Sequence, residues 1–281
     1  MADRATTASP ASITIAPRRS LATVDLLELW AYRELFYFLV WRDLKVRYKQ
    51  TLLGAAWAIL QPVGLALVLA FVLGSVNGIS SPGVPYGAFA LAGLVPWALV
   101  SQGVVRSSES LVASSNLLQK VYFPRLLLPI SAVGIHVIDY ALALPVLLVV
   151  CSAFGFAPGL PTLALVPLSA LAVLIALSAG IWLSALNVRY RDVRAALPFL
   201  VQLWLFASPI AYSSGLVPSW AAGIYRLNPI VGLVEGFRWA IFQTGPPPVT
   251  EILVAVAVTL LVLLTALTYF ASVERTFADV V

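Results

Sequence analysis

Long apolar stretches constrain this chain more than any other feature of its sequence. The first runs from Leu52 to Leu73, and similar runs recur as far as Phe270. An α-helix needs about 20 predominantly apolar residues to cross a bilayer. The chain is 61% hydrophobic and only 10% charged, whereas soluble domains have about 25% charged residues. The sequence therefore predicts an all-α membrane protein.

Six membrane-spanning helices are predicted from the positions of these stretches. Pro62 lies inside the first span and should kink it, because proline lacks a backbone donor. Gln61 is a polar side chain at membrane depth and should face protein or water. The predicted spans are Leu52–Leu73, Tyr86–Val105, a helix within Leu126–Phe154, Leu163–Leu186, Ala195–Tyr212 and Ile252–Phe270.

Lysine and arginine are distributed unevenly over the predicted loops. Eight precede the first span, three lie in 106–125, three lie in 187–194, and only Arg226 and Arg238 fall on the opposite side. Because cations favour the cytoplasmic side, both termini are predicted to be cytoplasmic in a multi-pass inner-membrane protein. The formal charge of +5 then reflects membrane orientation and contact with membrane lipids. We expect no nucleic-acid partner, since no soluble domain is predicted to carry a basic face.

Three segments flank the predicted six-span domain. Residues 1–24 are rich in Ala, Ser, Thr and Pro without an apolar core, which predicts a disordered cytoplasmic tail and not a signal peptide. Residues 25–50 are predicted to form an amphipathic helix along the inner leaflet; a soluble helix packed on a partner is the alternative. A six-span domain covers 51–272, and 273–281 is a short cytoplasmic tail. The interfacial candidates of the first helix are Trp30, Trp41, Arg42 and Arg47.

The segment 213–248 is too long for a simple turn. Asn228-Pro229 is typical of an N-cap followed by the first helical residue. The apolar run that follows ends at Phe242. This run is too short to cross the membrane, so we predict a re-entrant or interfacial helix on the extracellular side. Glu235 and Arg238 are three positions apart on it and can pair.

The loop 106–125 contains a short apolar stretch. Asn116 is expected to cap a small helix there, and Pro124 is expected to end it. Such a helix facing the cytoplasm should dock in a groove of another protein; packing against the chain's own N-terminal helix is the alternative. The candidate docking residues are Asn116, Leu117, Leu118, Gln119, Lys120, Val121, Tyr122 and Phe123.

Residues for catalysis are missing. None of the three lysines, Lys45, Lys49 and Lys120, follows a glycine, whereas a Walker A loop needs Gly-Lys to bind phosphates. We therefore predict no catalytic site, metal site or cofactor of its own. His136 and Asp139 lie three positions apart in an apolar segment. They are compatible with a proton relay or with a local hydrogen-bonded pair.

Four segments resemble the permeases of ABC transporters that export polysaccharides. Residues 42–62, RDLKVRYKQTLLGAAWAILQP, resemble the first-span signature, and 116–125, NLLQKVYFPR, resemble the coupling helix that seats in the ATPase. Residues 187–194 resemble the second cytoplasmic loop, and 228–238 resemble the extracellular gate segment. The resemblance covers nearly all of the chain from Leu26 onward, in the same order.

This resemblance implies the membrane subunit of an ATP-driven exporter. It would move a lipid-linked polysaccharide, such as O-antigen, teichoic acid or a capsule-like polymer, outward across the inner membrane. Two copies of the chain would join two copies of a separate ABC ATPase, which would bind ATP and Mg²⁺. A multidrug or small-lipid ABC exporter permease is one alternative. A proton-coupled secondary transporter using His136 and Asp139 is another.

Aromatic side chains in or beside the predicted spans suggest a path for the substrate. The C–H faces of sugar rings can stack on aromatic rings, although interface belts and core packing are commoner uses of aromatics in membranes. Trp57 and Trp97 lie beside predicted kinks and are the stronger candidates. The candidate path residues are Trp57, Gln61, Trp97, Trp204, Phe206 and Tyr212, and the candidate gate residues are Asn228, Pro229, Glu235 and Arg238.

Overall fold

The chain forms a bundle of helices, as the all-α prediction required. The computed structural model describes residues 26–49, 51, 53–74, 83–190 and 192–274, and the regular elements in these ranges are all helical. The predicted tails, 1–24 and most of 273–281, lie outside the described residues. The α-helices are α1 (Leu26–Ala31), α2 (Arg33–Tyr48), α3 (Ala56–Leu73), α4 (Tyr86–Ala113), α5 (Ser115–Lys120), α6 (Leu127–Ala153), α7 (Leu165–Arg189), α8 (Asp192–Phe206), α9 (Ala222–Arg226), α10 (Pro229–Phe242) and α11 (Val249–Val273).

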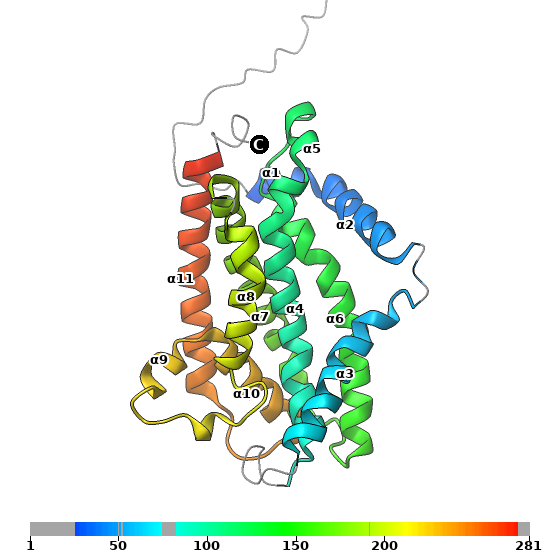
Figure 1. The fold of residues 1–281 in the computed structure, drawn as a ribbon, viewed down its shortest axis with the longest axis vertical. Coiled ribbons are helices and arrows are strands. Elements are labelled where there is room, and N and C mark those ends of the chain that lie inside the picture. The colour runs from blue at the N-terminus through cyan, green and yellow to red at the C-terminus, as the bar shows by residue number, and fades with distance from the viewer. Residues whose placement is uncertain (1–25, 50, 52, 75–82, 191, 275–281) are drawn as a thin grey trace, which may run out of the picture.

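Five of the described helices are long and apolar enough to cross a membrane. They are α3, α4, α6, α7 with the short 3₁₀ turn Leu160–Ala164 before it, and α11. Figure 1 shows α4, α6, α7, α8 and α11 running side by side, with α5 at one end and α9 and α10 at the other. We refer to these as the α5 end and the α10 end.

The fifth predicted span is shorter than expected. Its helix, α8, has 15 residues and ends at Phe206, where the predicted span continued to Tyr212. Residues 207–212 turn instead, and they contain Pro209, which cannot donate to a helical carbonyl. At about 1.5 Å per residue, α8 alone falls short of the roughly 30 Å of hydrocarbon. The count of six spans therefore stays a prediction.

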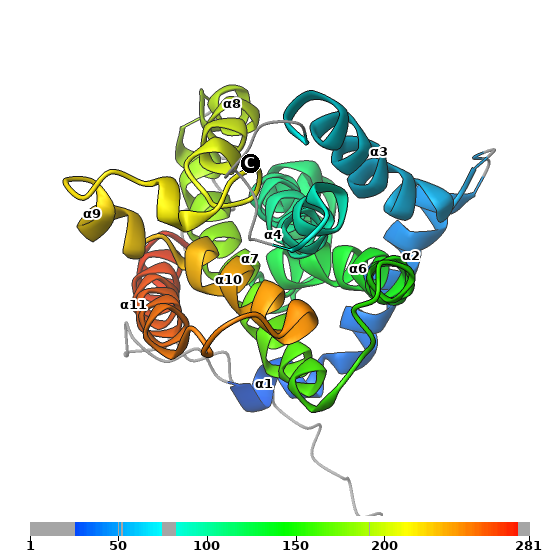
Figure 2. The same ribbon diagram turned by 90° about the horizontal axis from the view of Figure 1, so that it is seen from below.

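Helix α4 is the axis of the bundle. Figure 2 shows it surrounded by α3, α6, α7, α8 and α10. Its close approach to α7 depends on a small residue, because a Cβ added at Gly180 would lie 2.5 Å from the Cβ of Ser107. The Ser107 hydroxyl in turn donates to the carbonyl of Pro129, at 3.0 Å, and so joins α4 to α6. Small residues and hydroxyl bonds of this kind hold helices together in membranes, where apolar burial gives little drive.

Two predicted loops are largely helical. Helix α4 continues past Val105 to Ala113, so the first part of the predicted loop 106–125 extends a span. Helix α7 continues to Arg189, and α8 begins at Asp192, so the predicted loop 187–194 is short. The amide of Asn187 is buried and donates to the carbonyl of Ser108 at 2.9 Å. Polar residues predicted loops at these positions. In the structure the helices continue through them, because their side chains bond to a neighbouring helix.

The N-terminal helix is broken and packs on the side of the bundle against α6. The predicted single helix 25–50 is divided at Tyr32 into α1 and α2, and α2 runs obliquely beside the upper half of α6 in Figure 1. Trp30 and Trp41 are 70% and 43% exposed, as expected for side chains in a headgroup layer. Leu39 faces the opposite way and is buried in a core cluster that also contains residues of α6 and α11. The interfacial position of this helix stays a prediction.

Candidate functional site

The α5 segment presents a small and partly apolar surface. Tyr122 and Val121 are 82% and 50% exposed, and Figure 1 shows α5 extending beyond the long helices. The helix is shorter than predicted, because it ends at Lys120 and residues 121–124 are extended or irregular. Asn116 is inside the helix and is not its cap. The segment therefore offers Tyr122 as its most exposed aromatic group.

The other apolar residues of this segment point inward. Phe123 is only 4% exposed, and Leu117 and Leu118 pack on the same core cluster, which also contains Leu39 of α2. These residues share a core cluster with the N-terminal helix, which is compatible with the alternative of packing against that helix. Gln119 and Lys120 are exposed. The predicted docking surface is thus divided between an outward face around Tyr122 and an inward face that holds α5 in place.

Helix α10 begins as the sequence predicted. Asn228 is the N-cap, its side chain accepts from the backbone N–H of Ile230, and Pro229 is the first helical residue. The helix is buried on nearly every side, and it packs closely on α11 because of Gly232. A Cβ there would lie 2.1 Å from the carbonyl oxygen of Glu251. Its re-entrant position stays a prediction, but a helix apolar all round is one made to be buried.

The amide of Asn228 joins the end of α8 to the start of α10. Its Oδ1 accepts from Ile230 N at 3.1 Å and from Trp204 Nε1 at 2.9 Å. Its Nδ2 donates to the carbonyl of Ala207 at 3.2 Å and to Ser208 Oγ at 2.9 Å. These contacts use both amide hydrogens and the lone pairs of the oxygen. Asn228 is therefore a structural connection with no hydrogen-bonding capacity left over.

Arg238 makes a second buried connection at the same end. It is 4% exposed, and its Nη2 donates to the carbonyl of Ile210 at 2.9 Å. Its guanidinium lies 3.5 Å from the centroid of the Phe89 ring, an attractive cation–π geometry. Glu235 lies 3.8 Å from Nη1, so the predicted pair is present. The sequence placed Arg238 on a re-entrant or interfacial helix on the extracellular side, and the structure buries its side chain between α4 and the turn after α8.

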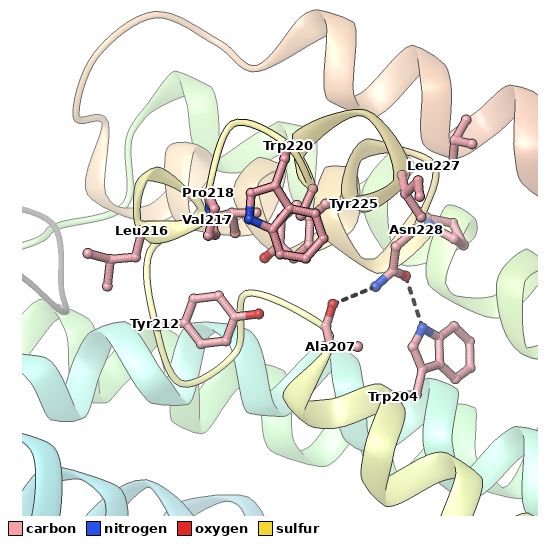
Figure 3. A pocket seen from close by; sticks show the side chains of 13 residues that line it. Trp204, Ala207, Tyr212, Leu216, Val217, Pro218, Trp220, Tyr225, Leu227 and Asn228 are labelled. Atoms are coloured by element: carbon pink, nitrogen blue, oxygen red, sulfur yellow. Dashed lines mark hydrogen bonds between the residues drawn. The ribbon is translucent and has the colours of Figure 1, made fainter.

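An aromatic cavity of about 800 Å³ opens beside these connections. Figure 3 shows Trp220 and Tyr225 on one side, Tyr212 on another, and Trp204 bonded to Asn228 at its edge. The cavity gathers residues from the end of α8, the connection to α10 and α9. Its walls are Trp204, Ala207, Tyr212, Leu216, Val217, Pro218, Trp220, Ala221, Ile224, Tyr225, Leu227, Asn228 and Pro229. Trp220 and Tyr225 were not among the predicted path residues.

The predicted path aromatics differ in their surroundings. Trp97 is 5% exposed and packs edge-to-face on Trp204, with ring centroids 5.4 Å apart. This position favours core packing, the commoner use considered from the sequence. Trp57 and Phe206 are 49% and 60% exposed on α3 and α8 and remain available for contacts outside the chain. Their role in a substrate path stays a prediction.

A cluster of four polar residues ties α2 to α6. Arg47 Nη2 lies 2.9 Å from Asp139 Oδ2, and His136 Nδ1 lies 3.3 Å from the same oxygen. The Tyr48 hydroxyl donates to Asp139 Oδ1. Burial and this bond raise the pKa of Tyr48 to about 12, so it remains a donor at neutral pH. Asp139 is 12 residues into α6, about 18 Å from its start. The His136/Asp139 pair is therefore part of a structural connection between α2 and α6.

A second polar residue accompanies Gln61 at membrane depth. Gln61 and Gln102 line a small cavity of about 30 Å³ together with Arg47 and Asp139, which fits the expectation that Gln61 faces protein or water. Gln102 was missed although it lies in the predicted span Tyr86–Val105, where the rule that singled out Gln61 would also have found it. Arg106, one helical turn further along α4, was missed as a site residue because it was taken as part of a loop.

Comparisons with known proteins agree with the family resemblance. The family model described as ABC-2 type transporter matches residues 34–242. The chain is 30% identical over 259 residues to the O-antigen export system permease protein RfbA of Myxococcus xanthus, covering 90% of this chain and 97% of that protein. It is 27% identical over 240 residues to RfbA of Klebsiella pneumoniae, covering 85% and 92%. It is 25% identical over 205 residues to the polysialic acid transport protein KpsM of Escherichia coli, covering 71% and 78%. The chain belongs to the ABC-2 type transporter family.

Proposed function

We propose that this chain is the membrane subunit of an ATP-driven exporter that moves a lipid-linked polysaccharide outward across the inner membrane. The observation that carries the proposal is the α5 segment, which exposes Tyr122 beyond the bundle in a chain whose lysines form no Walker A motif. Energy from ATP must then enter through contact with another protein. The relatives named for O-antigen export and polysialic acid transport support a polysaccharide as the cargo.

The proposed arrangement places the α5 end in the cytoplasm, with both termini on that side. Arg33, Arg42, Lys45, Lys120 and Arg125 belong to helices or connections at or leading from that end, which fits the preference of cations for the cytoplasmic side. A homodimer with two copies of the ATPase is part of the proposal. It would cover the exposed apolar residues of α3 and α8, among them Phe71, which is 90% exposed, and Phe199.

Labelling of single cysteines with a membrane-impermeant reagent tests the orientation. In a Cys151→Ala background, we expect Ser115→Cys and Tyr190→Cys to be protected in intact cells and Gly159→Cys and Gln243→Cys to react. Labelling of Ser115→Cys from outside would contradict the arrangement. Cys151 is itself buried, so its replacement by alanine is a mild change.

Polymer export tests the function itself. The full chain is co-expressed with an ABC ATPase encoded beside it, and surface polysaccharide is measured with and without each partner. We expect export to require both proteins, to stop with a Walker-lysine variant of the ATPase, and to be inhibited by vanadate in vesicles. Export of small amphiphiles with no polymer would favour the multidrug or small-lipid alternative.

A proton-coupled carrier is the other alternative. The observation that weakens it is the bonding of Asp139 to Arg47 and Tyr48, which engages both carboxylate oxygens and favours the charged form over one that carries a proton. Transport by the chain alone, driven by a pH gradient and lost in Asp139→Asn, would support the carrier and oppose the proposed function.

A further inference from the structure

A third cavity lies at the α5 end, where α2, α4, α5 and α6 meet. Its volume is about 470 Å³, within the roughly 300–1,000 Å³ of small-molecule sites. Three arginines line it, Arg42 and Arg47 from α2 and Arg106 from α4. They come from helices far apart in the sequence, so only the packing of α2 on the bundle brings them to one place.

The acidic residues of this cavity are already engaged. Asp43 pairs with Arg42, at 2.7 Å, and Glu109 lies 3.3 Å from Arg194, which is not among the cavity's walls. Arg47 is held by Asp139, at 2.9 Å.

Arg106 makes no ion pair with any residue that the structure describes, and its side chain is exposed to the cavity. The cavity therefore carries an excess of positive charge, and an anion entering it would meet a guanidinium without competing against a carboxylate.

The chemistry of the walls indicates what kind of anion fits. Guanidinium groups bind phosphate through paired hydrogen bonds. Beside the arginines the cavity has apolar walls, contributed by Val46, Leu128 and Ile135. The cavity also adjoins the α2 surface that carries exposed Trp41, a residue type that favours the headgroup layer. A cavity with charged and apolar walls side by side is expected to bind the phosphate end of an amphiphile more tightly than a free phosphate ion.

We propose that this cavity binds the phosphate or diphosphate head of a membrane lipid. Arg106 would contact the phosphate oxygens, with Arg42, which also pairs with Asp43, beside it, and the apolar walls would contact the first carbons of the lipid chain. Where that lipid carries the exported polymer, the inference rests on the proposed function and places recognition of the lipid link between α2 and α4. Binding of the headgroup can be measured without ATPase, polymer or export.

The test uses the full chain in phosphatidylcholine nanodiscs with radiolabelled farnesyl diphosphate as the probe. We expect saturable binding that is weakened about tenfold by the loss of Arg106 and further, up to about a hundredfold, by the loss of Arg42 in Arg42→Gln/Arg106→Gln, since each charged hydrogen bond is worth roughly one factor of ten. Arg33→Gln/Arg226→Gln removes the same charge from two exposed arginines outside the cavity and should bind like the wild type. Arg42→Lys/Arg106→Lys keeps the charge but not the guanidinium fork, and it should bind with intermediate affinity.

Competitors separate the possible sources of phosphate. Farnesol lacks the diphosphate and should not displace the probe. Displacement by an unlabelled polyprenyl diphosphate but not by phosphatidylglycerol would support a polymer carrier, and displacement by both would support anionic membrane lipids in general. Inorganic pyrophosphate that binds as tightly as the probe would overturn the assignment to a lipid. Equal binding by the cavity and control variants would overturn the site. Intact probe binding in a chain that exports no polymer would instead count against the proposed function alone.

Discussion

The two ends of the bundle treat their polar groups in opposite ways. At the α10 end, the Asn228 amide and the Nη groups of Arg238 bond to backbone and side-chain partners within the chain, and only Nε of Arg238 is left without a partner among the described residues. At the α5 end, Arg106 and Tyr122 keep their functional groups exposed. Buried polar groups must find internal partners because an unpaired one is costly, whereas exposed groups are free to bind another molecule.

This difference separates residues that hold the structure from residues that act on something else. Substitutions at the α10 end should lower stability first and lose function as a consequence. Substitutions of the exposed residues at the α5 end should leave stability unchanged and affect binding. The following changes test this contrast, from the largest expected effect on stability to the smallest.

Replacement of Arg238 should have the largest effect on stability. Arg238→Met removes the donor to Ile210 and leaves Glu235 without its cation. Removing one partner of a buried pair costs about 3–5 kcal/mol, and since Glu235 is partly exposed we expect about 3 kcal/mol. The measurement is unfolding in mixed micelles, followed by tryptophan fluorescence. Arg226→Met, at an exposed arginine of α9, is the control and should change stability by less than about 0.5 kcal/mol. Equal losses of stability in Arg238→Met and Arg226→Met would contradict the proposed difference between buried and exposed polar residues.

Asn228→Ala should destabilise the chain by about 2 kcal/mol, through loss of the cap and of the bonds to α8. Asn228→Asp keeps the oxygen that Ile230 and Trp204 need but cannot donate to Ala207. We therefore expect it to lose about half as much. The same unfolding assay measures the stability of both variants. An unchanged stability of Asn228→Ala would show that the amide does not hold α8 to α10.

Asp139→Asn should loosen one helix and leave the rest in place. The change removes the charge that holds Arg47, and we expect a loss of about 1–2 kcal/mol confined to the attachment of α2. Hydrogen–deuterium exchange should accelerate in Arg33–Tyr48 and remain unchanged in Pro229–Phe242. His136→Gln, which keeps the Arg47 and Tyr48 bonds, should accelerate exchange less. Uniform acceleration over all helices would mean that Asp139 supports the bundle as a whole.

Tyr122→Ala should have the smallest effect on stability, within about 0.5 kcal/mol, because the side chain is 82% exposed. It should nevertheless reduce co-purification of the ATPase and polymer export.

Leu118→Asp, the change that an outward-facing helix would suggest, is less informative, because Leu118 packs on the core and its loss would destabilise α5. Tyr190→Ala is the matched control, since Tyr190 is 51% exposed in the other connection at this end. Full retention of the ATPase by Tyr122→Ala would exclude this residue as a coupling contact.

The features that the sequence predicted well depend on neighbouring residues. The Asn228-Pro229 helix start and the Glu235/Arg238 pair follow from capping geometry and the helical repeat, and both are present. Boundaries were predicted less well. The first cytoplasmic loop was expected to begin at Arg106, but α4 continues to Ala113 because its serines bond to backbone carbonyls of the same helix and of α6.

The sequence by itself determined the helical class, the membrane character and the asymmetry of charge, because these depend on hydrophobicity and charge summed along the chain. Only the tertiary structure decided that Phe123 is buried while Tyr122 beside it is exposed. It also decided that Tyr48 bonds to Asp139, 91 positions away, and that Arg106 joins two arginines of α2 around one cavity. These facts depend on which faces of distant helices meet, and a linear pattern of apolar residues does not specify the partner of each face.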